Sequence, residues 1–164
     1  MEKIIFIRPG NHNIDGSLTG EGIRNIVDLS HKLKKFELNH KVRISILYSP
    51  TTHAHQTTNI LCREFNIKTE YSKEHAVLGR KISKNSTKHN EQISEIVEKE
   101  VEEKTDVLIM VTNKSVIKSF PSYYSISRLW GDCSYISLRS GEAFILNFDK
   151  AETTVFHQPM NIFD

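Results

Sequence analysis

Short apolar runs alternate along this chain with longer segments in which apolar residues recur at helical spacing. The runs at Lys3–Ile7, 42–48 and Val107–Val111 each end in polar or turn-forming residues and predict strands. The third run is continuous and apolar, which is typical of a parallel strand buried on both faces. Residues 67–71 predict a further short strand.

Four segments between these runs predict helices. The first has an apolar stripe, Thr19 as its N-cap and lysines in its last turn. The others cover residues 51–65, 90–104 and 115–120, and Pro121 limits the last of them. Strands that alternate with helices in this way predict an α/β fold with a mostly parallel sheet.

Two further segments complete the pattern. Residues 135–138 and 143–148, separated by residues 139–142, are typical of a closing β-hairpin. Residues 79–90 are polar, and we expect a surface loop that is either simply solvated or a basic lid over a pocket. Composition shifts only in this loop, so we predict one domain over residues 1–164, a three-layer sandwich with helices flanking the sheet.

The charge balance narrows the range of functions. The chain has 22 Lys and Arg residues against 20 Asp and Glu, a formal net charge of +2, which disfavours general binding to nucleic acid or to an anionic membrane. No apolar run approaches the ~20 residues of a membrane-spanning helix, and the N-terminus lacks the features of a signal peptide. Cys62 and Cys133 form no CxxC pair, so we expect free thiols and a cytoplasmic protein.

Polar groups follow the ends of the three most apolar strands. In an open α/β sheet, ligands bind beyond the carboxyl ends of the strands, so the topology alone is able to bring these groups to one pocket. They lie in Arg8-Pro9-Gly10-Asn11, in Ser49-Pro50 with the following Thr51-Thr52-His53-Ala54-His55-Gln56-Thr57, and in Thr112-Asn113-Lys114-Ser115.

The same segments carry four short motifs in a distinctive order. They are residues 4–10, Leu18-Thr19 with Gly22, Ser49-Pro50 with His53-Ala54 and Gln56-Thr57, and residues 107–113. This order resembles the histidine phosphatase, or phosphoglycerate mutase-like, superfamily. Its pattern is a strand ending in Arg-His-Gly, then Leu-Thr-x-x-Gly, then Ser-Pro-x-x-Arg-Ala-x-Gln-Thr, then an apolar strand ending in Thr/Ser-His. The resemblance covers essentially the whole chain, whose length is similar to that of the small phosphohistidine phosphatase-type members. It implies a phosphoglycerate mutase-like fold, with Gly141-Glu142-Ala143 opening the last strand.

The resemblance also identifies where this chain departs from the family. The family's His of Arg-His-Gly is the nucleophile, and here Pro9 stands in its place without a basic nitrogen to attack phosphorus. The family's second pocket His corresponds to Asn113, which carries no charge and is no general base. Its second pocket Arg corresponds to His53, a titrating group. Of the family's four central pocket groups, which include the Arg of Arg-His-Gly, only Arg8 remains in this chain. The acid that protonates the leaving group in the family would fall near Glu74.

These departures favour a degenerate, non-catalytic member of the superfamily, a pseudophosphatase. The leading hypothesis is that its pocket binds a phosphorylated small molecule, a phosphoprotein or another protein partner. The alternative is a divergent phosphatase that hydrolyses a phosphomonoester or phosphohistidine with altered residues. A third hypothesis is a purely structural role with a vestigial pocket, because a fold does not by itself establish a function.

Each candidate site residue has a structural alternative. Arg8 is either a phosphate anchor or an ion-pair partner, and His53 either a phosphate ligand or part of a helix surface. Asn113 with Lys114 either binds an anion at a helix N-terminus or caps that helix. Capping is favoured for Thr19, and a tight turn for Gly10. The expected phosphate pocket comprises Arg8, Gly10, Asn11, Thr19, His53, Asn113 and Lys114.

Histidines near this pocket raise two further hypotheses. A metal site would use His12, His53, His55 and Glu74 or His75. Residues two apart on a helix point about 200° from each other, so at most one of His53 and His55 faces the pocket. A His, His, carboxylate site assembled from different loops stays an alternative, but we expect neither a metal nor another cofactor. His12 follows the missing nucleophile by three residues and is a substitute nucleophile only if its geometry permits in-line attack.

Overall fold

Strands and helices alternate along the part of the chain that the structure describes. The structure is a computed structural model that describes residues 1–38, 41–81, 86–128, 131, 133, 137–150 and 152–157. The strands are β1 (Lys3–Ile7), β2 (Ile44–Tyr48), β3 (Ser72–Glu74), β4 (Val107–Val111), β5 (Ala143–Asn147) and β6 (Glu152–Phe156). The helices are α1 (Gly20–Phe36), α2 (Thr52–Phe65), α3 (Ser86–Glu102) and α4 (Lys114–Ser127), with 3₁₀ segments η1 (Thr69–Tyr71) and η2 (Ala76–Gly79).

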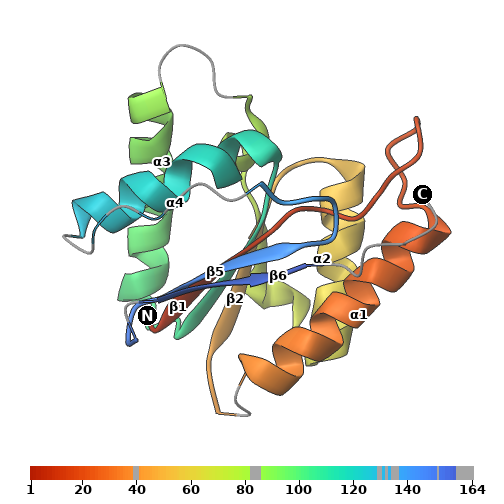
Figure 1. Cartoon of the computed structure of the whole chain (residues 1–164), viewed down its shortest axis with the longest axis horizontal. Helices are drawn as coiled ribbons and strands as arrows, with labels where there is room; N and C mark the ends of the chain where they lie inside the picture. Colours follow the sequence, from red (N-terminus) through yellow and green to blue (C-terminus); the bar gives the residue numbers. More distant parts are fainter. Residues whose placement is uncertain are drawn as a thin grey trace.

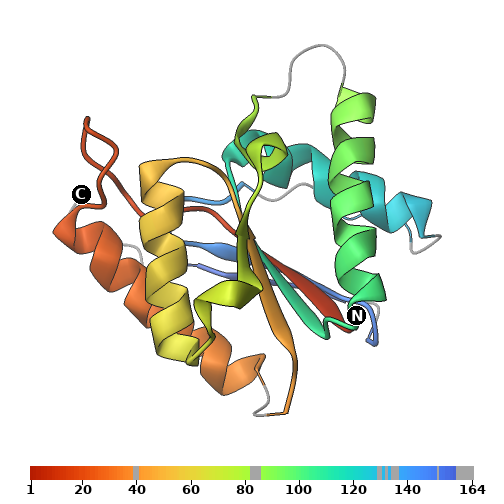
Figure 2. The same ribbon diagram turned by 180° about the vertical axis from the view of Figure 1, so that it is seen from behind.

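These strands form one sheet in the order β3-β2-β4-β1-β5-β6. The pairs β2–β3, β2–β4 and β1–β4 are parallel, whereas β5 and β6 are antiparallel additions at the β1 side. Helices α1 and α2 cover one face, and α3 and α4 cover the other (Figures 1 and 2). The predicted α/β sandwich with a mostly parallel sheet is therefore confirmed.

Alternation along β1 explains why both faces need helices. Ile4 and Phe6 belong to the cluster beneath α3 and α4, while Ile5 and Ile7 belong to the cluster beneath α1 and α2. Successive side chains of a strand point to opposite faces, and all four are fully buried. Burying each such side chain contributes roughly 1.5–3 kcal/mol, so exposing either face would cost much of the stability of the fold.

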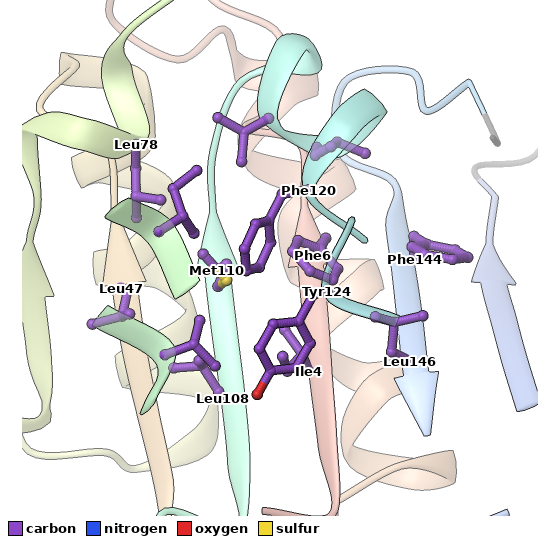
Figure 3. Close-up of a cluster of buried hydrophobic side chains, with 14 of the residues drawn as sticks. Ile4, Phe6, Leu47, Leu78, Leu108, Met110, Phe120, Tyr124, Phe144 and Leu146 are labelled. Carbon is purple, nitrogen blue, oxygen red and sulfur yellow. The ribbon is translucent and has the colours of Figure 1, made fainter. Parts of the chain in front are cut away.

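Aromatic packing joins α4 to the sheet. The Phe6 ring lies 6.1 Å from that of Phe120 and 6.3 Å from that of Phe144, measured between centroids (Figure 3). Tyr124 packs 5.4 Å from Phe120 in the same cluster, and its hydroxyl donates to the Glu98 carboxylate of α3. Burial raises the pKa of Tyr124 to about 12, so this hydroxyl remains a donor throughout the neutral range.

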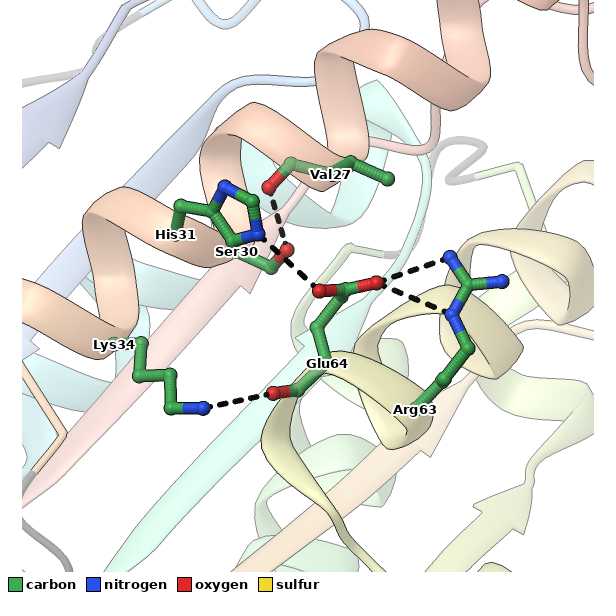
Figure 4. A network of polar contacts seen from close by, with 6 residues as sticks. All are labelled: Val27, Ser30, His31, Lys34, Arg63 and Glu64. Carbon is green, nitrogen blue, oxygen red and sulfur yellow. Dashed lines mark hydrogen bonds and ion pairs between the residues drawn. The ribbon is translucent and has the colours of Figure 1, made fainter.

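Polar contacts join α1 to α2 at the edge of their interface. Glu64 accepts two hydrogen bonds from Arg63 and lies 3.3 Å from His31 Nε2, while its backbone carbonyl accepts from Lys34 (Figure 4). The bonds from Arg63 contribute most to holding the pKa of Glu64 below its usual range. These contacts are largely solvated, so the buried apolar stripe of α1 carries most of the stability of the interface.

The predicted strand at residues 67–71 is wrong in its position. Thr69–Tyr71 form η1, and the strand is the polar triplet Ser72–Glu74. This strand lies at the sheet edge and pairs only with β2. Because an edge strand is not buried on both faces, it does not need an apolar sequence. The apolar Ile67 packs instead against the cluster beneath α1 and α2.

Two helices extend beyond their predicted bounds. The expected loop at residues 79–90 contains the first turn of α3 from Ser86, whose polar residues leave no periodic apolar signal. Helix α4 passes through Pro121 to Ser127. A proline inside a helix removes one backbone hydrogen bond and costs about 3 kcal/mol. The burial of Phe120, Pro121 and Tyr124 against the sheet offsets this cost.

The second strand of the predicted hairpin, β5, pairs with other strands than the one predicted. Strand β5 pairs with β1 on one side and with β6 on the other. Residues 134–136 lie outside the described residues, and Ser137 and Leu138 are not in a strand. Leu138 is buried and its carbonyl accepts a hydrogen bond from Arg8, so this segment crosses the end of the sheet rather than joining it.

A close approach between α1 and the chain after β1 leads to a stability prediction. A Cβ at Gly22 would lie 2.3 Å from the Asn11 carbonyl oxygen, whereas one at Gly20 would meet nothing nearer than 3.7 Å. We expect Gly22→Ala to lower the free energy of unfolding by about 1–3 kcal/mol, because backbone atoms must move. Gly20→Ala is the control in the same helix turn, expected to be neutral or stabilising by up to about 1 kcal/mol. Urea denaturation of both variants measures the difference, and equal effects would contradict the close-contact argument.

Candidate functional site

Three parallel strands end side by side at one edge of the sheet. In the pairing register, Ile7 of β1 and Tyr48 of β2 both lie opposite Val111 of β4. The residues that follow, Arg8, Ser49 and Thr112, therefore start three neighbouring loops. The three polar strand ends expected from the sequence are brought together by this register.

The chain also changes direction at this edge. After β1 it crosses to α1 on one face of the sheet, and after β4 it turns into α4 on the other face (Figure 2). Neighbouring strands whose connections leave toward opposite faces open a crevice beyond their carboxyl ends, where ligands of open α/β sheets bind.

A cavity of about 350 Å³ occupies this crevice. Its volume is within the range of small-molecule sites. The residues that line it come from all three strand ends, from the segment after η2 and from the turn before β5. They are Arg8, Pro9, His12, Ser49, Thr51, His53, Gly79, Lys81, Asn113, Lys114, Ser115 and Ser140.

The electrostatics of this cavity favour an anion. Arg8, Lys81 and Lys114 line it, and none of the described lining residues carries a carboxylate. The N-termini of α2 and α4 also open into it, since Thr51 and Asn113 are their N-caps. A helix N-terminus carries partial positive charge and unpaired N–H groups, so charge and dipoles act in the same direction.

Both the backbone N–H and the backbone carbonyl of Arg8 form hydrogen bonds. Its N–H donates to the Glu142 carbonyl (3.1 Å), and its carbonyl accepts from Gly141 (2.9 Å). The Nη1 group donates to the Leu138 carbonyl at 2.7 Å. This bond uses one of the five N–H groups of a guanidinium, so the fork is oriented in the cavity with donors left for a ligand.

The chain leaves the cavity after Pro9 and returns to it at His12. The buried Gly10 N–H donates to Thr57 Oγ1 of α2 (3.2 Å), and the Leu18 N–H donates to Gln56 Oε1 (2.7 Å). Between them, His12 forms a β-bridge with Leu18. The Gln-Thr pair of the third motif thus anchors the loop that returns His12 to the cavity.

The rings of His12 and His53 stack on each other. Their centroids are 4.0 Å apart and their planes differ by 6°. His53 Nε2 also lies 3.4 Å from the Thr51 hydroxyl. Burial, and then the nearby His12 ring, hold the pKa of His53 below its ordinary value.

Asn113 uses both ends of its amide within the protein. Its Oδ1 accepts from the N–H groups of Ser115 (2.9 Å) and Val116 (3.1 Å). Its Nδ2 donates to the carbonyls of Leu78 (3.1 Å) and Arg80 (3.4 Å). Asn113 therefore caps α4, as the structural alternative predicts, and the same side chain joins the start of α4 to the Leu78 and Arg80 carbonyls in and after η2.

The remaining sequence candidates lie behind or outside the cavity. Thr19 caps α1 by accepting from the Gly22 N–H (2.9 Å), as predicted, and its own N–H donates to the Asn11 carbonyl. Gly10, Asn11 and Thr19 are not lining residues. Glu74 is exposed at the end of β3 and is also not a lining residue, so no acid faces the cavity from that position.

Several lining residues were not among the sequence candidates. Ser49 and Thr51 belong to the polar segment after β2, whose position at a strand end was the available signal. Lys81 lies in the segment for which a basic lid was one of two interpretations, and its place at the cavity agrees with that alternative. Ser140 carries no local signal, because only the turn before β5 brings it to this edge.

The histidines proposed as metal ligands do not come together as a metal-binding group in the described part of the chain. His55 stacks on Tyr48 (5.6 Å between centroids) and is not a lining residue of the cavity. Among the described residues, no group of three or more His, Cys, Asp and Glu side chains is able to hold a metal ion. In the described part of the chain, neither Cys62 nor Cys133 forms a disulfide.

A larger cavity, of about 830 Å³, lies near the C-terminal ends of α1 and α2. Lys34, Arg43 and Lys68 line it together with apolar residues such as Phe65 and Tyr71. Helix C-termini carry partial negative charge, so the helix dipoles that favour an anion in the smaller cavity oppose one here.

No helix in the described ranges combines the length and the apolar character that crossing a membrane requires.

Comparison with known proteins rests on structure alone. No protein-family model matches the chain, and neither does any curated protein sequence. The protein histidine phosphatase SixA, solved with tungstate, is similar with a TM-score of 0.70 at 13% identity over 94% of each chain. A mycobacterial glucosyl-3-phosphoglycerate phosphatase with VO₃ has a TM-score of 0.65 at 10% identity, over 96% of this chain and 98% of that one. The phosphoglycerate mutase of Plasmodium falciparum has 0.58 at 18% identity, over 99% and 96%. Such matches across nearly whole chains show that this chain has the histidine phosphatase, or phosphoglycerate mutase-like, fold.

Proposed function

We propose that this protein is a pseudophosphatase that binds a phosphorylated ligand without hydrolysing it. One observation carries the proposal. Pro9 is buried in the lining of a cation-lined cavity, at the position where the family resemblance expects the nucleophilic His. The anion-binding features of the pocket remain, while the atom that would attack phosphorus is missing.

Binding is supported by the groups around the cavity. Arg8, Lys81 and Lys114 supply permanent positive charge, and the N-termini of α2 and α4 add the partial positive charge of their helix dipoles. Hydrogen bonds to charged groups contribute about 1.5–3 kcal/mol each, so a few such contacts suffice for a phosphate group. Three of the similar structures were solved with tungstate, VO₃ or inorganic phosphate, and all of these are oxyanions.

Loss of turnover is supported by the chemistry of three positions. Pro9 has no lone pair available for a covalent phosphoenzyme. The Asn113 amide is committed to the α4 cap and to the carbonyls of Leu78 and Arg80. Glu74 does not line the cavity, so no described lining group is a carboxylic acid that could protonate a leaving group. Removal of a nucleophile closes the covalent route rather than slowing it.

A divergent phosphatase is the second candidate, and one observation favours it. His12 lines the same cavity and stacks on His53, so an imidazole is present beyond the lost position. The ligand in either case is a phosphorylated small molecule or a phosphoprotein, and we propose a cytoplasmic location on the sequence argument.

The first prediction concerns binding. Isothermal titration with inorganic phosphate is expected to show one site, and Arg8→Ala to weaken it by roughly 10–100-fold, because a charge-assisted contact is lost. Arg24→Ala, an exposed arginine of α1 outside the cavity lining, is the matched control and should leave the affinity unchanged. Equal affinity in both variants, or no binding at all, would count against the proposal.

The second prediction concerns turnover. The wild-type protein should hydrolyse neither an aryl phosphate nor a phosphohistidine peptide above the rate of Arg8→Ala, and no phosphoenzyme should accumulate. Turnover that disappears in Arg8→Ala would show a catalytic pocket and support the divergent phosphatase. A further loss in His12→Ala would then identify His12 as the substitute nucleophile.

A further inference from the structure

The stacked pair His12–His53 is the feature of this cavity that the proposed function leaves unexplained. His12 comes from the loop between β1 and α1, and His53 from the first turn of α2. Both line the cavity, and their centroids are 4.0 Å apart with planes 6° from parallel. A neutral imidazole stack is stable at this separation, whereas two imidazolium rings repel each other strongly.

The surroundings of His53 oppose its protonation when the cavity holds no anion. Arg8 faces the cavity from the end of β1, Lys81 from the segment after η2 and Lys114 from α4. The groups from the other elements, Ser49, Thr51 and Ser140, are neutral, so no described lining residue supplies negative charge. Burial and the His12 ring lower the pKa of His53, which is the direction that these surroundings impose.

A doubly charged anion in the cavity would reverse the preference for neutral imidazole rings. It lies among the same cations, favours the protonated form of each ring and offsets the repulsion between the two rings. An imidazolium also donates from both ring nitrogens, whereas the neutral ring donates from one. The bound state therefore holds more protons than the free state.

We propose that His12 and His53 couple binding of a phosphate monoester dianion to proton uptake, so that affinity rises as the pH falls. This inference rests on the proposed function and specifies the ligand charge and the regulation of the same site. By linkage, affinity increases up to tenfold per pH unit for each proton taken up. An arginine in place of His53 would hold an anion at any pH, whereas this pair releases it toward alkaline pH.

The experiment uses sulfate as the probe, because it stays doubly charged between about pH 5.5 and pH 8, unlike phosphate. Isothermal titration in buffers of different ionisation enthalpy gives both the affinity and the number of protons taken up. We expect the affinity for sulfate to rise at least tenfold between about pH 8 and pH 6, with net proton uptake. Histidine signals in NMR titrations should show the pKa of the His53 ring rising in the presence of sulfate.

Matched variants separate the pair from other histidines. His12→Asn and His53→Asn should each reduce the proton uptake and flatten the pH dependence. His55→Asn, two residues along α2 and not a lining residue, should keep the wild-type dependence. Folding of each variant is checked by its thermal transition, and the exposed position of His12 makes it the safer of the two substitutions.

The outcomes distinguish this inference from the proposed function. Failure of both sulfate and phosphate to bind at any pH would overturn both. Binding without pH dependence or proton uptake would overturn the coupling and leave the proposed function in place. Unchanged proton uptake in both His12→Asn and His53→Asn would also overturn it, because the protons would then enter elsewhere.

Discussion

The pairing of β4 between β1 and β2 is the constraint on which the rest of this structure depends. Ile7, Val111 and Tyr48 lie opposite one another, so three strands end at the same level. All five residues of β4 are buried, and a slip of one residue would turn each side chain to the opposite face. The core thus determines the register, and the register determines that Arg8 and Asn113 meet at one cavity.

The motif residues hold the loops of this site through contacts within the protein. Gln56 and Thr57 accept hydrogen bonds from the backbone of the loop after β1, and Asn113 caps α4 while donating to the carbonyls of Leu78 and Arg80. These contacts are structural, and none of them needs a nucleophile. With Pro9 at the end of β1, the loops around the cavity are therefore still anchored.

The charge arrangement of the cavity is unfavourable for the isolated protein and favourable for a complex. Arg8, Lys81 and Lys114 line it without a described carboxylate among them, and two histidines are stacked beside them. A site built mainly for stability would include counter-charges. An anion supplies the missing charge, so binding and the protonation of the histidines are expected to reinforce each other.

The sequence by itself determined the apolar strands β1, β2 and β4, the helices with a clear stripe and the Thr19 cap, because burial and capping leave local patterns in the chain. It also determined which chemical groups follow each strand. The edge strand β3, the pairing of β5 with β6 and the passage of α4 through Pro121 were decided by tertiary packing. Tertiary packing also decided which residues line the cavity. His12 meets His53, and Asn113 meets the Leu78 carbonyl, across long stretches of chain. Local periodicity carries no information about such contacts, because they exist only once the register of the sheet has placed the loops.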